Sequence, residues 1–167
     1  MEKRYLTRNQ LFRAIRDESK NHGEYPFHPE RRHLHDGRVA DAESSLRLYF
    51  NDEDLTPYSD DEKITWRVIA IDLSHPLTMQ TALFLNGTRV AGIDPQLAPC
   101  SFRYDRSTVS KAKYHMNIIN CNEKGAVISN THLDISEFKE YFTDIYRFAE
   151  AVAKIWNIDY WTDQLLL

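Results

Sequence analysis

The chain has little cysteine and little glycine, which excludes several kinds of functional site. Its 167 residues include two cysteines and five glycines. Cys100 and Cys121 can form at most one disulfide bond, too few for a disulfide scaffold, so a reducing cytoplasm is the expected compartment. The glycines form no phosphate-binding loop, and the sequence contains neither an HExxH motif nor a nucleophile elbow. No cofactor is therefore predicted.

Long apolar runs are also missing. The first ten residues, MEKRYLTRNQ, lack the apolar region of a signal peptide, and no segment reaches the length of a membrane span. A chain of this length fits one domain, residues 1–167, and can bury roughly two thirds of its unfolded surface. We therefore expect a soluble cytoplasmic protein that does not interact with a membrane.

The net charge of −4 argues against a protein that is basic over its whole surface. The charge is distributed unevenly along the chain. Residues 51–62 hold six acidic residues and no basic one, whereas residues 101–124 hold five basic residues against two acidic ones. The second segment is therefore the candidate region for contact with a negatively charged molecule.

Residues 24–44 have little hydrophobic periodicity and contain prolines, arginines and histidines, so we predict an irregular segment with a turn at Asp36-Gly37. His33 and His35, two positions apart on an extended segment, suggest a metal site that either His28 or Asp36 would complete. We do not predict a metal, because no four-ligand spacing is present and three arginines crowd the same stretch.

Alternation, apolar runs and turn signals together predict strands at residues 45–50, 64–73, 79–85, 88–91, 111–121 and 126–129. Residues 64–73 are apolar on both faces and should be central and among the most buried. Asn86-Gly87 favours a tight hairpin between its two neighbouring strands. The two prolines of residues 94–100 predict that this segment leaves the sheet.

Two helices are expected. Thr7 and Gln10 have capping-box spacing at the start of a short helix from Arg8 to His22. Asp134 and Glu137 have the same spacing before an apolar stripe that predicts a long helix from Ile135 to Trp156. The predicted fold class is α+β: an antiparallel sheet of about five or six strands, covered by the long C-terminal helix and the shorter N-terminal helix. The apolar tail at residues 158–167 either folds back or belongs to an interface, which leaves a homodimer open.

The strand at residues 111–121 carries the most chemistry. One face is apolar and contains Ala112, Tyr114, Met116 and Ile118, and the other contains Lys111, Lys113, His115 and Asn117. Side chains on one face of a strand repeat about every 7 Å. The second face is therefore a row of amine, imidazole and amide groups available to a ligand.

Residues 103–117, RYDRSTVSKAKYHMN, are similar to a pattern in the TumE-like toxins of bacterial toxin–antitoxin systems. In that family an Arg-Tyr-Asp segment is followed by a strand with His-x-His and then by a helix. Arg103, Tyr104 and Asp105 match as they stand, His115 matches the first histidine, and Asn117 replaces the second. The resemblance covers residues 66–155 at most and implies a small α+β toxin directed at RNA.

Cleavage of RNA without a metal needs a base for the 2′-hydroxyl, an acid for the leaving oxygen, and cations for the phosphorane charge. The predicted catalytic residues are Arg103, Asp105, Lys113 and His115. His115 is the candidate base, and Asp105 either orients it or pairs with an arginine. The second proton-transfer group would have to be Tyr104 or His132, because Asn117 cannot serve.

The sequence is therefore compatible with two classes of function. One is an RNA-directed nuclease that works through the basic and histidine-bearing strand face. The alternative is a non-enzymatic inhibitor or adaptor of a defence, counter-defence or toxin–antitoxin system, which binds a partner protein through the acidic residues 51–62 and the apolar tail. The expected partner is RNA in the first class and a specific protein in the second.

Overall fold

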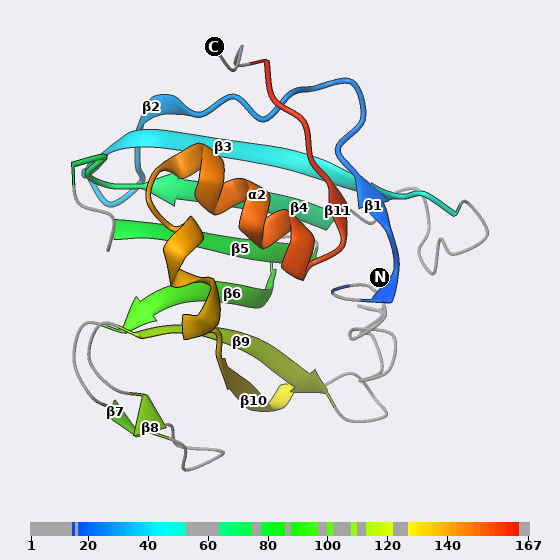
Figure 1. Cartoon of the computed structure of the whole chain (residues 1–167), viewed down its shortest axis with the longest axis vertical. Coiled ribbons are helices and arrows are strands. Elements are labelled where there is room, and N and C mark those ends of the chain that lie inside the picture. The colour runs from blue at the N-terminus through cyan, green and yellow to red at the C-terminus, as the bar shows by residue number, and fades with distance from the viewer. Residues whose placement is uncertain are drawn as a thin grey trace.

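The computed structural model describes residues 15, 17–52, 64–74, 78–85, 88–96, 100–101, 108–109, 113–121 and 127–163. Within them the chain is mostly β. Nine strands form one curled sheet in the order β10-β9-β6-β5-β4-β3-β1-β11, and β2 pairs with β3 (Figure 1). Neighbouring strands are antiparallel except β1 and β11, which are parallel.

The strands of the large sheet are β1 (Lys20–Asn21), β2 (Glu30–His33), β3 (Val39–Phe50), β4 (Ile64–Ala70), β5 (Met79–Leu85), β6 (Thr88–Gln96), β9 (Lys113–Cys121), β10 (Val127–Asp134) and β11 (Ile158–Asp159). A separate ribbon pairs β7 (Cys100–Ser101) with β8 (Thr108–Val109). The predicted hairpin around Asn86-Gly87 is confirmed, because Leu85 and Thr88 are the last paired residues of β5 and β6. The predicted buried strand is also confirmed as β4, in which Trp66, Val68 and Ala70 are fully buried.

The predicted α+β class with two covering helices is wrong. The only α-helix in the described part of the chain is α2 (Ile145–Ile155), preceded by a 3-10 turn, η4 (Ser136–Tyr141). Asp134 does not cap a helix, because it is the last residue of β10 and pairs across the sheet. Asp144 is the cap instead, and its side chain accepts hydrogen bonds from the backbone N–H groups of Tyr146 and Arg147.

The predicted N-terminal helix falls largely on residues outside those described. The prediction that this helix extends to His22 is wrong, because Lys20 and Asn21 form β1 and pair with β3 and β11. The expectation of about five or six strands is wrong for a related reason: short segments such as β1 and β11 carry no periodicity that a sequence pattern can register.

The hydrophobic core lies between α2 and one face of the sheet (Figure 1). The buried stripe of α2 includes Ile145, Phe148 and Val152, as the apolar spacing predicted. Trp156 caps the C-terminal end of the helix and is fully buried against the sheet. These contacts fix which face of each strand points to the helix and which points away from it.

Residues 24–44 are more regular than predicted. They contain β2 and the start of β3, joined by a turn in which Gly37 has a φ of 86°. The turn confirms the expectation at Asp36-Gly37 and places it in a hairpin. β2 escaped the hydrophobic-pattern analysis because all four of its residues are exposed, so neither face carries an apolar signal.

The prediction that residues 94–100 leave the sheet is wrong for the first three of them. β6 continues through Asp94 and Pro95 to Gln96, each of which pairs with β9. The last β5–β6 pair joins Thr81 to Ile93, so beyond this point β6 has a neighbour on one side only. A strand with one free edge accommodates a proline because the missing N–H can face that edge.

The described part of the apolar tail, residues 158–163, folds back, which is one of the two predicted alternatives. Ile158 and Asp159 pair with β1, and the Trp161 carbonyl accepts a hydrogen bond from the Phe27 N–H at 3.0 Å. Thr162 bridges to the same part of the chain. Within the described residues, none of the helices has both the length and the apolar character needed to cross a membrane.

Candidate functional site

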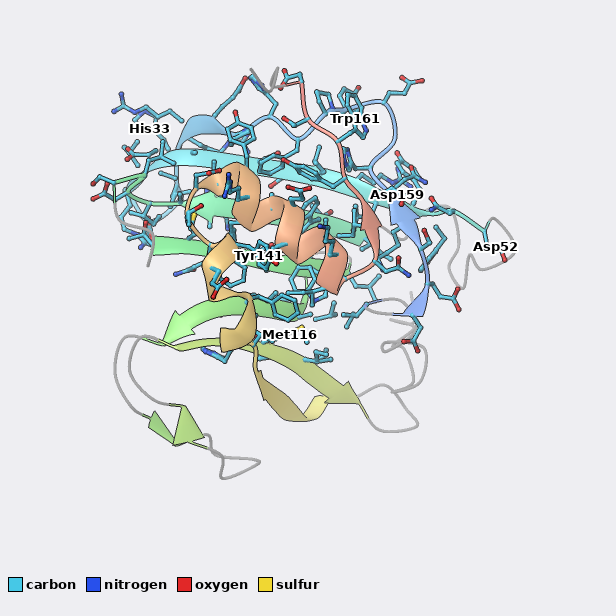
Figure 2. All side chains as sticks on the ribbon, in the orientation of Figure 1. His33, Asp52, Met116, Tyr141, Asp159 and Trp161 are labelled. Atoms are coloured by element: carbon cyan, nitrogen blue, oxygen red, sulfur yellow. The ribbon has the colours of Figure 1, made fainter. Side chains whose placement is uncertain are left out.

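The face of the sheet that points away from α2 carries the candidate site and is called the polar face below. Cross-strand pairing defines its members, which include Glu43, Ser45, Arg67, Gly92, Asp94, His115 and Asn117. Met116 and Ile118 of β9 are buried on the other face, against the helix. Met116 lies near the C-terminal end of α2 (Figure 2). The predicted division of this strand into two faces is therefore confirmed for residues 115–118.

His115 differs from expectation in one respect. The sequence pattern placed it on a solvated face, but only 7% of its surface is exposed. Its direct cross-strand partners are Asp94 on β6 and Asp134 on β10. Directly opposed residues in antiparallel strands have Cβ atoms about 4.5–5.5 Å apart. The structure therefore places two aspartate positions beside His115, and the sequence analysis had assigned them to a loop and to a helix cap.

A bulge in β6 brings an arginine to the polar face. Leu83 pairs with Ala91 and Phe84 pairs with Arg89, so Val90 is an extra residue. Without it, Arg89 would share a face with Ala91 and point toward the core, because a one-residue shift exchanges the two faces of a strand. Nη2 of Arg89 lies 2.6 Å from the Asp94 carboxylate and 3.5 Å from Oδ1 of Asn117.

Gly92 makes room for this arginine. A Cβ atom at residue 92 would lie 1.8 Å from Nη2 of Arg89 and 2.5 Å from its Cζ, so the guanidinium lies directly over the glycine. The cross-strand partner of Gly92 is Asn117. Arg89, Asp94, His115 and Asn117 thus form one cluster, called the histidine cluster, held together by backbone register.

Of the other predicted site residues, Arg103 and Asp105 lie outside the described residues. Lys113 is the first residue of β9 and pairs with Gln96, two positions before His115. His132 is the cross-strand partner of Asn117, so it is a diagonal neighbour of His115, at a spacing of about 7–8 Å. His132 was one of the two candidates for the second proton-transfer group, and the register places it beside the first.

The polar face continues from the histidine cluster to the other side of the sheet. One cross-strand row joins Ser45, Arg67, Ala82, Gly92 and Asn117. Arginines contributed by different strands to this face are Arg32, Arg47, Arg67 and Arg89. The guanidinium of Arg47 lies 5.0 Å from the centre of the exposed Tyr49 ring. An arginine-bearing surface therefore exists on a protein whose net charge is negative.

The histidines that suggested a metal are spread over different environments. His28 pairs with Glu30 and Asp163, at 3.1 Å in both cases. His33 is exposed in the β2–β3 hairpin, several strands away from Met116 of β9 (Figure 2). No cluster of three His, Cys, Asp or Glu residues suited to a metal ion occurs within the described ranges.

Comparison of the chain with protein-family models, curated proteins and solved structures gave no significant match. Function is therefore inferred from the polar face: its arginines, its paired carboxylates and the two neighbouring histidine positions.

Proposed function

We propose that this protein binds single-stranded RNA along the polar face and cleaves it in the cytoplasm without a metal ion. The observation that carries the proposal is the register of β6, β9 and β10. It sets His115 beside Asp94 and diagonal to His132, with the Arg89 guanidinium two residues away over Gly92. Acid, base and cation are the three groups that metal-independent cleavage of RNA requires.

In this mechanism His115 takes the proton of a ribose 2′-hydroxyl, and the 2′-oxygen attacks the adjacent phosphorus. The bond from phosphorus to the 5′-oxygen breaks, and His132 gives a proton to that oxygen. The products are a 2′,3′-cyclic phosphate and a 5′-hydroxyl, and no further reactant is consumed. Arg89 stabilises the charge on the phosphorane, and Asp94 shares that arginine while lying opposite His115. The 2′-hydroxyl must reach the small exposed part of His115.

The surface around the histidine cluster supports binding of a nucleic-acid strand. Proteins that bind single strands combine cationic grooves with aromatic side chains on which bases stack. The polar face offers Arg47, Arg67 and Arg89 for phosphates and the exposed Tyr49 for a base. Arginine also pairs bidentately with phosphate, which lysine cannot do.

The test is incubation of the purified protein with a single-stranded RNA and with DNA of the same sequence, in EDTA. We expect cleavage of the RNA to 2′,3′-cyclic phosphate ends and no cleavage of the DNA, which lacks the attacking hydroxyl. His115→Gln and His132→Ala should each lower the rate by about two orders of magnitude. His28→Gln, a change at an exposed histidine that pairs with Glu30 and Asp163 and lies outside the histidine cluster, is the matched control. RNA that stays intact, or cleavage that EDTA abolishes, contradicts the proposal.

The interaction-protein alternative depends on two surfaces. Residues 53–62 of the acidic segment lie outside the described residues, and the tail as far as Asp163 is engaged with β1 and Phe27. The described part of the tail is thus already engaged within the chain, and the arginines of the polar face support RNA as the partner. Purification at native expression level distinguishes the two classes, because a stoichiometric protein partner without RNA would favour the alternative.

A further inference from the structure

An open hollow of about 460 Å³ lies on the polar face where the β2–β3 hairpin meets β4. Its lining includes three arginines, Arg32, Arg38 and Arg67. The volume is within the range of small-molecule sites and is large enough for a phosphate with part of its nucleotide. The arginines come from β2, from the hairpin and from β4, so the hollow is built by chain segments that are distant in sequence.

A buried carboxylate organises this hollow. The side chain of Glu43 is 2% exposed and accepts a hydrogen bond from Oγ of Ser45 at 2.7 Å. It also forms an ion pair with Nε of Arg32, 3.0 Å from its other oxygen. Nε of Arg67 lies 3.9 Å from the other side of the same carboxylate. A buried charge is retained only with such partners, so Glu43 holds both guanidiniums in place from below.

The contact with Glu43 uses only the Nε atoms of the two guanidiniums and leaves their terminal amino groups available to a ligand. Arg32 and Arg67 both face Glu43 with Nε, and among the described residues their terminal amino groups have no hydrogen-bond or ion-pair partner. The terminal amino groups form the planar fork that matches the oxygens of a phosphate. The hollow therefore contains two oriented forks and one buried counter-charge.

Arg38 does not take part in the same way. Its Nε and Nη2 both contact Oδ2 of Asp36, at 2.7 and 2.6 Å. The hydrogen bond from the Arg38 side chain lowers the pKa of the Asp36 carboxyl. The charges of this arginine and this aspartate therefore cancel each other. The net positive charge of the hollow thus comes from Arg32 and Arg67 against Glu43.

We propose that Arg32 and Arg67 form a second phosphate-binding site, which holds a backbone phosphate of the single strand away from the point of cleavage. β4 and β9 are three strand spacings apart, which corresponds to roughly 14 Å along the sheet. A strand bound at both places would run across the strands of the polar face. The inference rests on the proposed function only in naming RNA as the molecule that carries the phosphate.

The test uses a twelve-nucleotide single-stranded RNA with 2′-O-methyl groups throughout, which cannot be cleaved through its 2′-oxygens. Affinity is measured at several salt concentrations for the wild type, Arg32→Ala and Arg67→Ala. Each variant should bind about tenfold more weakly, and the slope of log K against log salt should fall by about 0.7 for each phosphate that the protein no longer neutralises. Arg32→Lys should keep most of the slope but not the affinity, because it keeps the charge without the fork.

Arg31→Ala is the matched control, because Arg31 is the neighbouring exposed arginine of β2 and does not line the hollow. Loss of affinity in Arg31→Ala equal to that in Arg32→Ala would overturn the proposal, since it would mean diffuse attraction only. Unchanged binding in both Arg32→Ala and Arg67→Ala would overturn it as well.

A second measurement separates RNA from free phosphate. The melting temperature is recorded in inorganic phosphate and in chloride of equal ionic strength. Stabilisation by phosphate that disappears in Arg32→Ala, together with weaker RNA binding, supports the site as proposed. Stabilisation by phosphate with unchanged RNA binding overturns its assignment to RNA. Failure of cleavage with retained arginine-dependent binding rejects the proposed reaction and leaves the phosphate site standing.

Discussion

Nε1 of Trp156, at the C-terminal end of α2, donates a hydrogen bond to Sδ of Met116 in β9 at 3.1 Å. Both side chains are buried. Because side chains alternate along a strand, the contact that turns Met116 toward the helix also turns His115 and Asn117 to the polar face. The core of the fold and the candidate site are thus set by the same strand register.

Replacement of Met116 by alanine should lower the free energy of unfolding by about 2–5 kcal/mol, because it removes buried volume under Trp156. Met116→Leu keeps most of that volume and should cost less than about 1.5 kcal/mol. Denaturant unfolding followed by tryptophan fluorescence measures both. An alanine variant as stable as the wild type would mean that α2 does not pack on β9.

Asp144 is the helix cap that the structure identifies in place of Asp134. Its carboxylate accepts hydrogen bonds from the N–H groups of Tyr146 and Arg147, each at 2.9 Å. Asp144→Ala should cost about 1 kcal/mol of stability, whereas Asp144→Asn should cost only a few tenths, because asparagine caps about equally well. Thermal unfolding of the two variants checks this, and equal losses would contradict the capping role.

Gly92→Ala tests whether the position of Arg89 matters, without changing any charge. The added methyl group would collide with the guanidinium, which is the flexible end of a long side chain, so we expect Arg89 to move and the Arg89–Asp94 ion pair to break. Stability should change by less than about 1 kcal/mol, because the pair is partly exposed. RNA cleavage should fall as far as it does in Arg89→Ala.

The control is the double variant, Gly92→Ala with Arg89→Ala. It should be no less active than Arg89→Ala alone, because the three atoms nearest to the added methyl group all belong to Arg89. Additive losses of activity in the double variant would show that residue 92 acts in some other way.

Local sequence patterns correctly predicted the elements whose structure is determined by residues close together in the chain. The apolar run of β4, the Asn86-Gly87 hairpin and the two faces of β9 are all of this kind. β2 was missed because both of its faces are exposed, and it exists only because β3 lies beside it. The start of the C-terminal helix was predicted ten residues too early, because the capping-box spacing at Asp134 is a local signal. The pairing of Asp134 with His115 depends on a strand that is remote in sequence.

The candidate site divides in the same way. His115 was identified because its face follows from the alternation of its own strand. Arg89 could not be assigned to that face, since the bulge at Val90 is defined only by pairing with β5. Asp94 was overlooked because Pro95 reads as a strand breaker, and only the end of the β5–β6 pairing explains how the proline is accommodated. The sequence therefore located the strand of the site, and tertiary pairing supplied its partners.

His22 joins the N-terminal and C-terminal parts of the chain and should make stability depend on pH. Its Nδ1 lies 2.6 Å from the Tyr25 carbonyl oxygen, and the Trp161 backbone N–H lies 3.2 Å from its Nε2. The Trp161 ring also stacks on the imidazole, with centroids 5.6 Å apart. A neutral ring that donates through Nδ1–H and accepts at Nε2 satisfies both contacts, whereas a doubly protonated ring faces the Trp161 N–H with a second donor.

Burial lowers the pKa of His22 below its ordinary value of 6.5. The unfolded chain therefore binds a proton at this residue more readily than the folded one. The contribution of His22 to stability should be full above about pH 6.5, fall as the pH drops through that value, and level off below the folded-state pKa.

The measurement is the free energy of unfolding between pH 5 and 8, for the wild type and for His22→Gln. The variant should lose this part of the pH dependence, while His33→Gln, at an exposed histidine, should keep it. A wild-type curve that His22→Gln leaves unchanged would mean that another group is responsible for the pH dependence.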